Sequence, residues 1–246
     1  MVHWKLYFSE KKIWYQVNLI SIVIPVYNEE DCIKNLIEEI YKVVKLNFEL
    51  ILVDDGSNDN TNQILEQLKN IYHFTIISNK FNKGQSFSIK KGIENSIYET
   101  IVTLDADGQN NPKDILLLFN KYFQNSSIKM VGGIRINRKD STVKIYSSKI
   151  ANFIRMAILN DNCKDTGCSL KIFDKNIFLK FPYFNGIHRF IPALFSGYGY
   201  KTAFVNVSHR ARITGVSKYG TFDRLFRGII DIYKVKKIIS RKDLDD

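Results

Sequence analysis

The chain has 246 residues, of which 45% are hydrophobic, so it can bury one large core, and we expect one domain with appended elements. The formal net charge is +11, and residues 210–242 hold ten Lys or Arg against two Asp, a local charge of +8 that favours an anionic partner such as nucleic acid, a lipid surface or a phosphorylated substrate. The three cysteines lack the second pair or histidines of a zinc site, and no apolar run is long enough for a signal peptide or a membrane span, so we expect free thiols in a soluble or membrane-surface protein.

The first half of the chain alternates predicted strands and helices. Apolar runs at residues 20–26, 50–53, 74–77 and 100–104 are typical of strands buried on both faces. Between and after them, apolar residues recur at helical spacing, and Pro112 stands where the first turn of the next helix is expected. This alternation predicts an α/β fold with a mostly parallel sheet, right-handed crossovers and flanking helices.

Acidic and turn-forming residues follow three of these strands, at residues 28–29, 54–55 and 105–107. Each cluster alone is as well explained by a capping turn. Because ligands in parallel sheets bind beyond the carboxyl ends of the strands, the clusters together indicate a site where a cation or hydrogen-bond donors offset negative charge. A nucleotide diphosphate with a divalent ion fits this site, whereas the glycine patterns of dinucleotide-binding and Walker proteins are absent.

Four motifs, in this order, resemble the family-2 inverting glycosyltransferases of the GT-A fold: SIVIPVYNEE at 21–30, VDDGS at 53–57, Lys83-Gly84 and DADGQ at 105–109. Later segments at 165–171, 186–192 and 215–220 look like the polyprenyl-phosphate glycosyltransferases, namely dolichol-phosphate mannose synthases and bacterial undecaprenyl-phosphate relatives. The resemblance covers about residues 18–240. We expect an N-terminal extension at 1–17, a GT-A domain at 18–220 and a basic amphipathic helix at 221–246.

The resemblance also implies which residues form the donor site. It places a metal set at Asp105, Asp107 and Gln109, where Mg²⁺ or Mn²⁺ would bridge the diphosphate oxygens of the donor and neutralise the charge on the leaving group. The residues that it implies for the donor nucleotide are Pro25, Tyr27, Glu29, Asp54, Asp55, Lys83, Asp105 and Lys218.

The acceptor side is expected around two arginines. Arg135 and Arg138 follow a predicted strand that ends in Gly132-Gly133, so two planar guanidinium groups can reach one phosphate; the alternative is a pair of exposed arginines on a loop. Asp165 matches the family's carboxylate at the reaction centre and, with Asp107, is a catalytic candidate. Because a lipid monophosphate with a second pKa near ~6 is mostly ionised at pH 7, we expect Asp165 to orient substrates rather than to act as a base.

The segment around His188 is open to two interpretations. His188-Arg189 could contact phosphate, or His188 could be a packed structural group among aromatic residues.

Two segments have the pattern of amphipathic basic helices, residues 143–158 and 224–241. Such helices can lie in the headgroup region of an anionic membrane, but the apolar side of the second one could equally pack against the sheet or a second subunit. We therefore expect a peripheral enzyme on the cytoplasmic, inner face of the membrane, or one that a membrane-spanning partner anchors.

Taken together, these features predict a metal-dependent inverting transfer of a hexose from a GDP- or UDP-sugar to undecaprenyl or dolichyl phosphate. One alternative is a glycosyltransferase that acts on a sugar hydroxyl in cell-surface polysaccharide synthesis. Another is a non-catalytic nucleotide-sugar or nucleic-acid binding protein. The basic tail lacks the stacking platform expected for single-stranded nucleic acid, so we expect no nucleic-acid partner.

Overall fold

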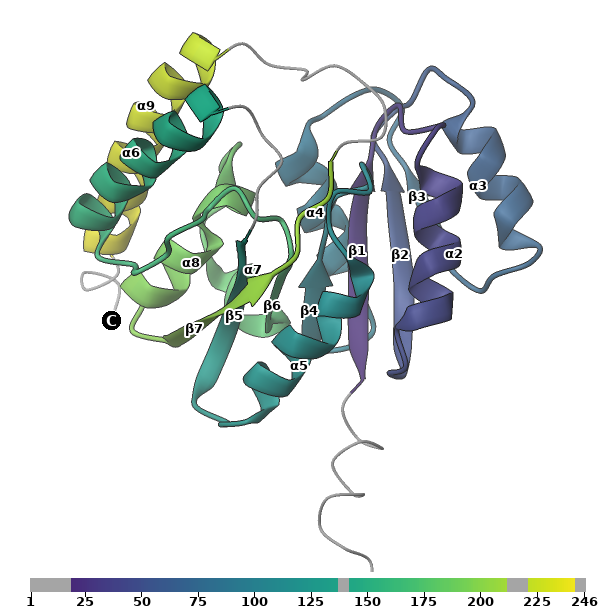
Figure 1. Cartoon of the computed structure of the whole chain (residues 1–246), viewed down its shortest axis with the longest axis horizontal. Helices are drawn as coiled ribbons and strands as arrows, with labels where there is room; N and C mark the ends of the chain where they lie inside the picture. Colours follow the sequence, from purple (N-terminus) through teal and green to yellow (C-terminus); the bar gives the residue numbers. More distant parts are fainter. Residues whose placement is uncertain (1–18, 137–141, 212–220, 242–246) are drawn as a thin grey trace, which may run out of the picture.

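A computed structural model of the chain describes residues 19–136, 142–211 and 221–241. Its centre is a seven-stranded sheet in the order β3-β2-β1-β4-β6-β5-β7 (Figure 1). The strands are β1 (Ile20–Val26), β2 (Phe48–Asp54), β3 (Thr75–Ser78), β4 (Thr100–Thr103), β5 (Ile128–Arg135), β6 (Lys171–Asp174) and β7 (Lys201–Val207). All neighbouring pairs are parallel except those of β6, which runs antiparallel to both β4 and β5. The predicted mostly parallel α/β sheet is confirmed.

Helices cover both faces of the sheet (Figure 1). One buried cluster joins α2, α3 and α5 to one face, and a second joins α4, α7 and α8 to the other. The helices are α2 (Ile33–Val43), α3 (Thr61–Lys69), α4 (Gln85–Glu94), the short 3₁₀ helix η1 (Pro112–Asp114), α5 (Ile115–Phe123), α6 (Thr142–Leu159), α7 (Lys175–Lys180), α8 (Ile187–Gly197) and α9 (Thr221–Arg241). The start of helical structure at Pro112 was predicted correctly.

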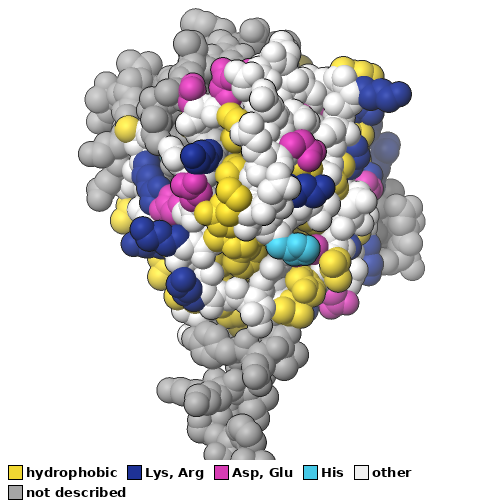
Figure 2. Space-filling view, turned by 90° about the vertical axis from the view of Figure 1, so that its right-hand side faces the viewer, with side chains coloured by type: hydrophobic (Ala, Val, Ile, Leu, Met, Phe, Trp, Pro, Cys, Tyr) yellow, Lys and Arg dark blue, Asp and Glu magenta, His cyan; other side chains and the backbone are white. Residues whose placement is uncertain are grey.

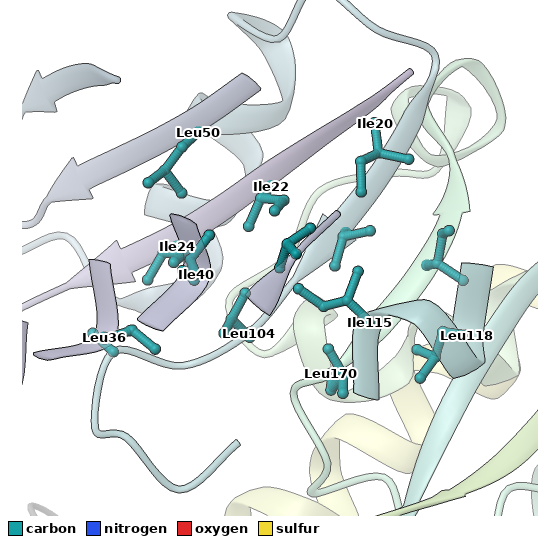
Figure 3. Close-up of a cluster of buried hydrophobic side chains, with 14 of the residues drawn as sticks. Ile20, Ile22, Ile24, Leu36, Ile40, Leu50, Leu104, Ile115, Leu118 and Leu170 are labelled. Atoms are coloured by element: carbon teal, nitrogen blue, oxygen red, sulfur yellow. The ribbon is translucent and has the colours of Figure 1, made fainter. Parts of the chain in front are cut away.

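The apolar strand runs supply both cores because side chains alternate along a strand. Ile22 and Ile24 point into the cluster with α2 and α5 that Figure 3 draws, whereas Val23 belongs to the cluster on the opposite face. The second layer packs closely: a Cβ at Gly92 of α4 would collide with Cγ1 of Val23 and lie 3.0 Å from Cγ2 of Val53. Gly92 therefore sets the distance between α4 and the sheet.

Pro25 lies in the central strand at a position that does not need its N–H. The carbonyl of Val26 accepts a bond from the N–H of Asp55, so Val26 faces β2, and the preceding Pro25 faces the β4 side. The β1–β4 ladder ends at the Val23–Thr103 pair. The missing donor therefore falls beyond the end of β4, where proline is tolerated.

Strand β5 continues farther than the sequence predicted. It was expected to end at Gly132-Gly133, but its pairing with β7 runs on to the Arg135–Val207 pair. The glycines leave room for neighbours rather than ending the strand: a Cβ at Gly133 would lie 2.8 Å from Sγ of Cys168, and one at Gly132 would lie 3.1 Å from the Phe204 ring. Arg135 is consequently the last residue of a strand and has a fixed backbone.

Helices α6 and α9 lie side by side at one end of the molecule, next to α8 (Figure 1). Val235 of α9 is fully buried, and Ile239 packs against Gly197 at the end of α8. The apolar side of α9 thus packs partly against the domain, while Tyr233 remains exposed. Within the described ranges, no helix combines the length and apolarity needed to cross a membrane.

Charge is mixed on the opposite end of the molecule. Figure 2 looks onto the side of α2, α3 and β3, where Lys and Arg side chains alternate with Asp and Glu among the described residues. No extended one-sign patch is visible on the described part of this face.

Candidate active site

The loop after β4 carries the predicted metal residues on a tight turn. The N–H of Gln109 donates to Oδ1 of Asp107 at 3.1 Å, and the N–H of Asp105 donates to Oδ1 of Asn110 at 3.2 Å. Gly108 takes a positive φ of 72°, which closes the turn. This turn places both carboxylates at the carboxyl edge of the sheet.

The carboxyl group of Asp105 is placed where a cation would stabilise it. Burial and the neighbouring Asp107 raise the pKa of Asp105 to about 6, despite opposing contributions from Ser169 and Lys171. Its Oδ1 accepts a 2.7 Å hydrogen bond from the amide of Gln85. Two half-buried carboxylates on one turn are a hard-oxygen donor set that fits Mg²⁺ or Mn²⁺. Among the described residues no group of three His, Cys, Asp or Glu forms a metal site, so the amide oxygen of Gln109 and the substrate would have to complete the coordination.

A salt bridge holds the segment beside Gln109. The N–H of Arg210 donates to the carbonyl of Gln109 at 3.0 Å, and the Gln109 amide reaches the carbonyl of Arg210 at 3.4 Å. The Arg210 guanidinium makes two 2.7 Å bonds to Glu39 of α2 and lowers the pKa of that carboxyl. Arg210 therefore links the loop after β4 to α2.

Asp165 and Arg135 form a bidentate ion pair. Nε and Nη2 of Arg135 donate to the two carboxylate oxygens at 2.8 and 2.7 Å, and the backbone N–H of Arg135 adds a bond of 3.1 Å. Gly167 leaves the necessary room, since a Cβ there would lie 2.7 Å from Nη2 of Arg135. The predicted acceptor-phosphate residue and the predicted catalytic carboxylate thus lie together, which the sequence did not indicate.

Helix α6 holds the loop that carries Asp165. Asn152 accepts bonds from the N–H and the hydroxyl of Thr166, immediately after Asp165. Before it, the buried Arg155 pairs with Asp161, which in turn accepts the N–H of Cys163. The loop is consequently tied to α6 on both sides of Asp165.

The predicted nucleotide residues lie at the carboxyl ends of β1 and β2. Asp55 is buried and accepts three bonds of 2.8 to 3.0 Å, from the amide of Asn79 and the N–H groups of Lys83 and Gly84. Asp54 likewise accepts the N–H of Ser57 at 3.0 Å. In this structure both carboxylates shape the surrounding loops through these bonds.

The other predicted donor residues frame the same edge. Tyr27 and Glu29 follow β1, and the N–H of Glu29 donates to the hydroxyl of Thr61 at 2.9 Å. The side chain of Lys83 is exposed, with Nζ 4.5 Å from the centre of the Phe87 ring. The remaining two predicted residues, Arg138 and Lys218, lie outside the described residues.

A cavity of about 450 Å³ adjoins Asp105. Gln85, Ser169 and Lys171 are among the lining residues for which the sequence indicated no role; Gln85 follows the Lys83-Gly84 motif, and the other two belong to the 165–171 motif. The lining residues are Gly84, Gln85, Ile89, Thr103, Asp105, Thr166, Gly167, Ser169, Lys171, Asn185, Gly186, His188, Arg189, Ile191, Ile230 and Asp231.

Residues of α8 and α9 also line the cavity. Nδ1 of His188 lies 2.7 Å from the hydroxyl of Ser86, which also accepts the N–H of Gly186 at 2.8 Å. Arg189 of α8 pairs with Asp231 of α9 at 2.6 Å. Burial is the main cause that lowers the pKa of His188 to about 3, and Arg189 contributes. His188 is therefore a neutral group at neutral pH.

Comparison with known proteins identifies the family. The profile described as Glycosyl transferase family 2 matches residues 21–181. The undecaprenyl-phosphate 4-deoxy-4-formamido-L-arabinose transferase of Pseudomonas fluorescens (strain Pf0-1) is 33% identical over 89% of this chain and 65% of its own length. The dodecaprenyl-phosphate galacturonate synthase of Rhizobium johnstonii is 34% identical over 88% of this chain and 66% of its own length. The chain thus spans about two thirds of these relatives.

Solved structures agree on the fold. The glucosyl-3-phosphoglycerate synthase of Mycobacterium tuberculosis in complex with uridine diphosphate superimposes with a TM-score of 0.73 at 17% identity, over 96% of this chain and 86% of that one. The complex of the same enzyme with Mn²⁺, UDP and glucosyl-3-phosphoglycerate gives a TM-score of 0.71 at 16% identity. The expected GT-A fold is confirmed, and the chain belongs to glycosyl transferase family 2.

Proposed function

We propose that this protein transfers a sugar from a nucleotide diphosphate sugar to a polyprenyl phosphate, with inversion at the anomeric carbon and with a divalent metal ion. The observation that carries the proposal is the meeting of the Asp105–Asp107 pair, the cavity and the Arg135–Asp165 pair at one edge of the sheet. The reaction forms the bond from the lipid phosphate oxygen to the anomeric carbon. It breaks the bond from that carbon to the departing nucleoside diphosphate.

The donor side is supported by the carboxylates around β1, β2 and β4. Asp105, Asp107 and Gln109 would hold Mg²⁺ or Mn²⁺, which supplies positive charge to the diphosphate leaving group. The mycobacterial neighbour was crystallised with Mn²⁺ and UDP, and the fold is shared. The turn at Asp54 and Asp55 is ordered by internal hydrogen bonds and offers a preformed surface for the nucleoside.

The acceptor side is supported by the names of the relatives, which specify undecaprenyl and dodecaprenyl phosphates. Their sugars are a modified pentose and a hexuronic acid, so the expected hexose remains one choice among several. We assign Arg135 and Arg138 to the acceptor phosphate. In the described structure Arg135 is engaged by Asp165, so an incoming phosphate would share this guanidinium with the carboxylate.

Asp165 is proposed to orient the substrates. Its carboxylate is fixed by Arg135 through two side-chain bonds and one backbone bond, which suits a positioning group. A phosphate that is already ionised needs little help from a base. If the acceptor were instead a sugar hydroxyl, a base would be required, and Asp165 would be the candidate for that base.

The membrane is proposed to lie against α6 and α9. Among their described residues, these helices expose apolar side chains, whose contact with water is unfavourable. Exposed lysines on the same helices can bind anionic headgroups. The exposed apolar residues are Ile150, Phe153, Ile154, Ile158, Ile230 and Tyr233. A peripheral position on the inner face of the membrane, with or without a membrane-spanning partner, is the corresponding proposal for location.

Transfer assays with separate donor and acceptor panels test this function. Labelled UDP- and GDP-sugars are incubated with undecaprenyl phosphate and Mn²⁺, Mg²⁺ or EDTA, and the chloroform-extractable product is counted. We expect a lipid product from one donor class, which EDTA abolishes and Asp107→Asn reduces at least 100-fold. Donor hydrolysis without lipid product would contradict the acceptor assignment, and transfer that persists in EDTA would contradict the metal assignment.

A further inference from the structure

Helix α8 lines part of the cavity with the polar side chains of His188 and Arg189. Their hydrogen bonds go to Ser86 and Asp231, and not to the predicted metal residues or to the Arg135–Asp165 pair. We propose that His188 contacts the transferred sugar and helps to determine which sugar is accepted, and that Ser86 positions its ring. The proposal rests on the nucleotide-sugar reaction proposed above and names the part of the same site that recognises the sugar.

The position of the cavity favours a sugar as its occupant. Asp105 both belongs to the metal set and lines the cavity. Because the sugar of a donor is bonded directly to the diphosphate, a diphosphate held at Asp105 puts the sugar into the adjoining space. The volume of about 450 Å³ lies within the range of small-molecule pockets, about 300 to 1,000 Å³.

The ring of His188 is held from behind. Its Nδ1 lies 2.7 Å from the hydroxyl of Ser86, a residue that is almost fully buried in α4. The same hydroxyl accepts the N–H of Gly186, where φ is 108° and the chain turns into α8. Since Nδ1 is bonded on the Ser86 side and His188 lines the cavity, the Nε2 edge of the ring is left to face the cavity.

The surroundings keep the ring uncharged. His188 shares the cavity with the cations Lys171 and Arg189 and with the carboxylates of Asp105 and Asp231. Burial together with the two cations lowers the pKa of His188 far below neutrality. In either neutral tautomer Nε2 keeps one hydrogen-bonding function, which matches a sugar hydroxyl because a hydroxyl can both donate and accept.

Binding measurements separate sugar recognition from nucleotide recognition. Dissociation constants of UDP-glucose, UDP-glucuronate and GDP-mannose are compared with those of UDP and GDP, all with Mn²⁺, by isothermal titration calorimetry. For the sugar nucleotide that the unmodified protein binds best, His188→Ala should weaken binding about tenfold relative to the sugar-free nucleotide, and Ser86→Ala about threefold. The sugar-free nucleotide should bind all variants within twofold of the unmodified protein.

Ser96→Ala is the matched control. Ser96 is also a buried serine, just beyond the other end of α4, and its hydroxyl donates to the carbonyl of Ile93. We expect no change in either constant. His188→Gln retains a neutral hydrogen-bonding side chain, should recover part of the lost affinity, and provides a second variant if His188→Ala folds poorly.

Three results would overturn the proposal. The first is that His188→Ala weakens the binding of the nucleotide and of the sugar nucleotide equally, and the second is that it changes neither dissociation constant. The third is that the unmodified protein binds no sugar nucleotide more tightly than the corresponding sugar-free nucleotide. The titrations contain no lipid acceptor, so an error in the acceptor assignment would not change the measured dissociation constants. Absence of all nucleotide binding would instead refute the proposed function itself and this assignment with it.

Discussion

Removal of the Arg135 guanidinium should reveal how strongly the Arg135–Asp165 pair stabilises the site. The two side chains are only 13% and 6% exposed, and they meet through two bonds of 2.7 and 2.8 Å. Arg135→Met removes both guanidinium bonds to a largely buried carboxylate and leaves the backbone bond from residue 135. Breaking one side of a buried pair costs roughly 3–5 kcal/mol, so we expect a loss near the lower end because that backbone bond remains.

A double-mutant cycle measures the pair itself. Urea denaturation followed by circular dichroism gives the free energy of unfolding for the unmodified protein, Arg135→Met, Asp165→Asn and the double variant. Because the neutral amide of Asp165→Asn no longer needs a cation, the second substitution should cost little once the first is made. We expect a coupling energy of at least about 2 kcal/mol.

Additive effects of the two substitutions would show that the Arg135–Asp165 pair does not stabilise the fold. A coupling energy below about 0.5 kcal/mol would mean that solvent screens the pair as it screens surface salt bridges. A matched control is the exposed pair Lys90–Glu94 on α4, whose nitrogen and oxygen lie 3.3 Å apart. The same cycle there should give no more than about 0.5 kcal/mol.

Gly92→Ala should destabilise the fold by roughly 1–3 kcal/mol in urea denaturation despite the better helix propensity of alanine, because the added methyl group meets β1; an unchanged or increased stability would show that α4 can move away from the sheet. The folded-state pKa of His188 is lowered to about 3, so the unfolded chain binds a proton below pH 6.5 that the folded chain rejects, and stability from this group is lost as the pH falls. The unmodified protein should therefore lose about 2 kcal/mol more stability than His188→Gln between pH 7 and pH 5, and equal losses would contradict a neutral, half-buried imidazole. Phe153→Asp should weaken binding to anionic vesicles in sedimentation at least tenfold, while Ile71→Asp, an equally exposed position next to α3, should not, and equal effects would argue against α6 as the lipid-facing element. Asp165→Asn should lose most transfer activity without moving the pH optimum, whereas a large alkaline shift would identify a true base.

Local patterns predicted the elements that form the donor site. The strand at residues 20–26 and the helical start at Pro112 agree with β1 and η1, because continuous apolar runs and an early proline are local signals. The Asp105–Asp107 pair could be found for the same reason, since both carboxylates lie on one turn. The end of β5 was predicted wrongly because the glycines at 132–133 looked like a turn, although they make room for Cys168 and Phe204.

Contacts between distant segments could not be read from local patterns. Arg135 and Asp165 are 30 residues apart, and they meet because β6 lies antiparallel between β4 and β5. Ser86 and His188 are 102 residues apart and meet only through the packing of α4 against α8. The roles of these side chains depend on tertiary packing, so the sequence alone left His188 open between two interpretations.

The chemical identity of the acceptor group distinguishes transfer to a lipid phosphate from transfer to a hydroxyl. Undecaprenyl phosphate and undecaprenol, the same lipid without the phosphate, are offered in parallel with the donor that the protein uses, and the products are analysed by mass spectrometry. We expect a sugar phosphodiester from undecaprenyl phosphate and no product from undecaprenol. Transfer to undecaprenol, or to the hydroxyl of an added sugar in place of the lipid phosphate, would contradict it.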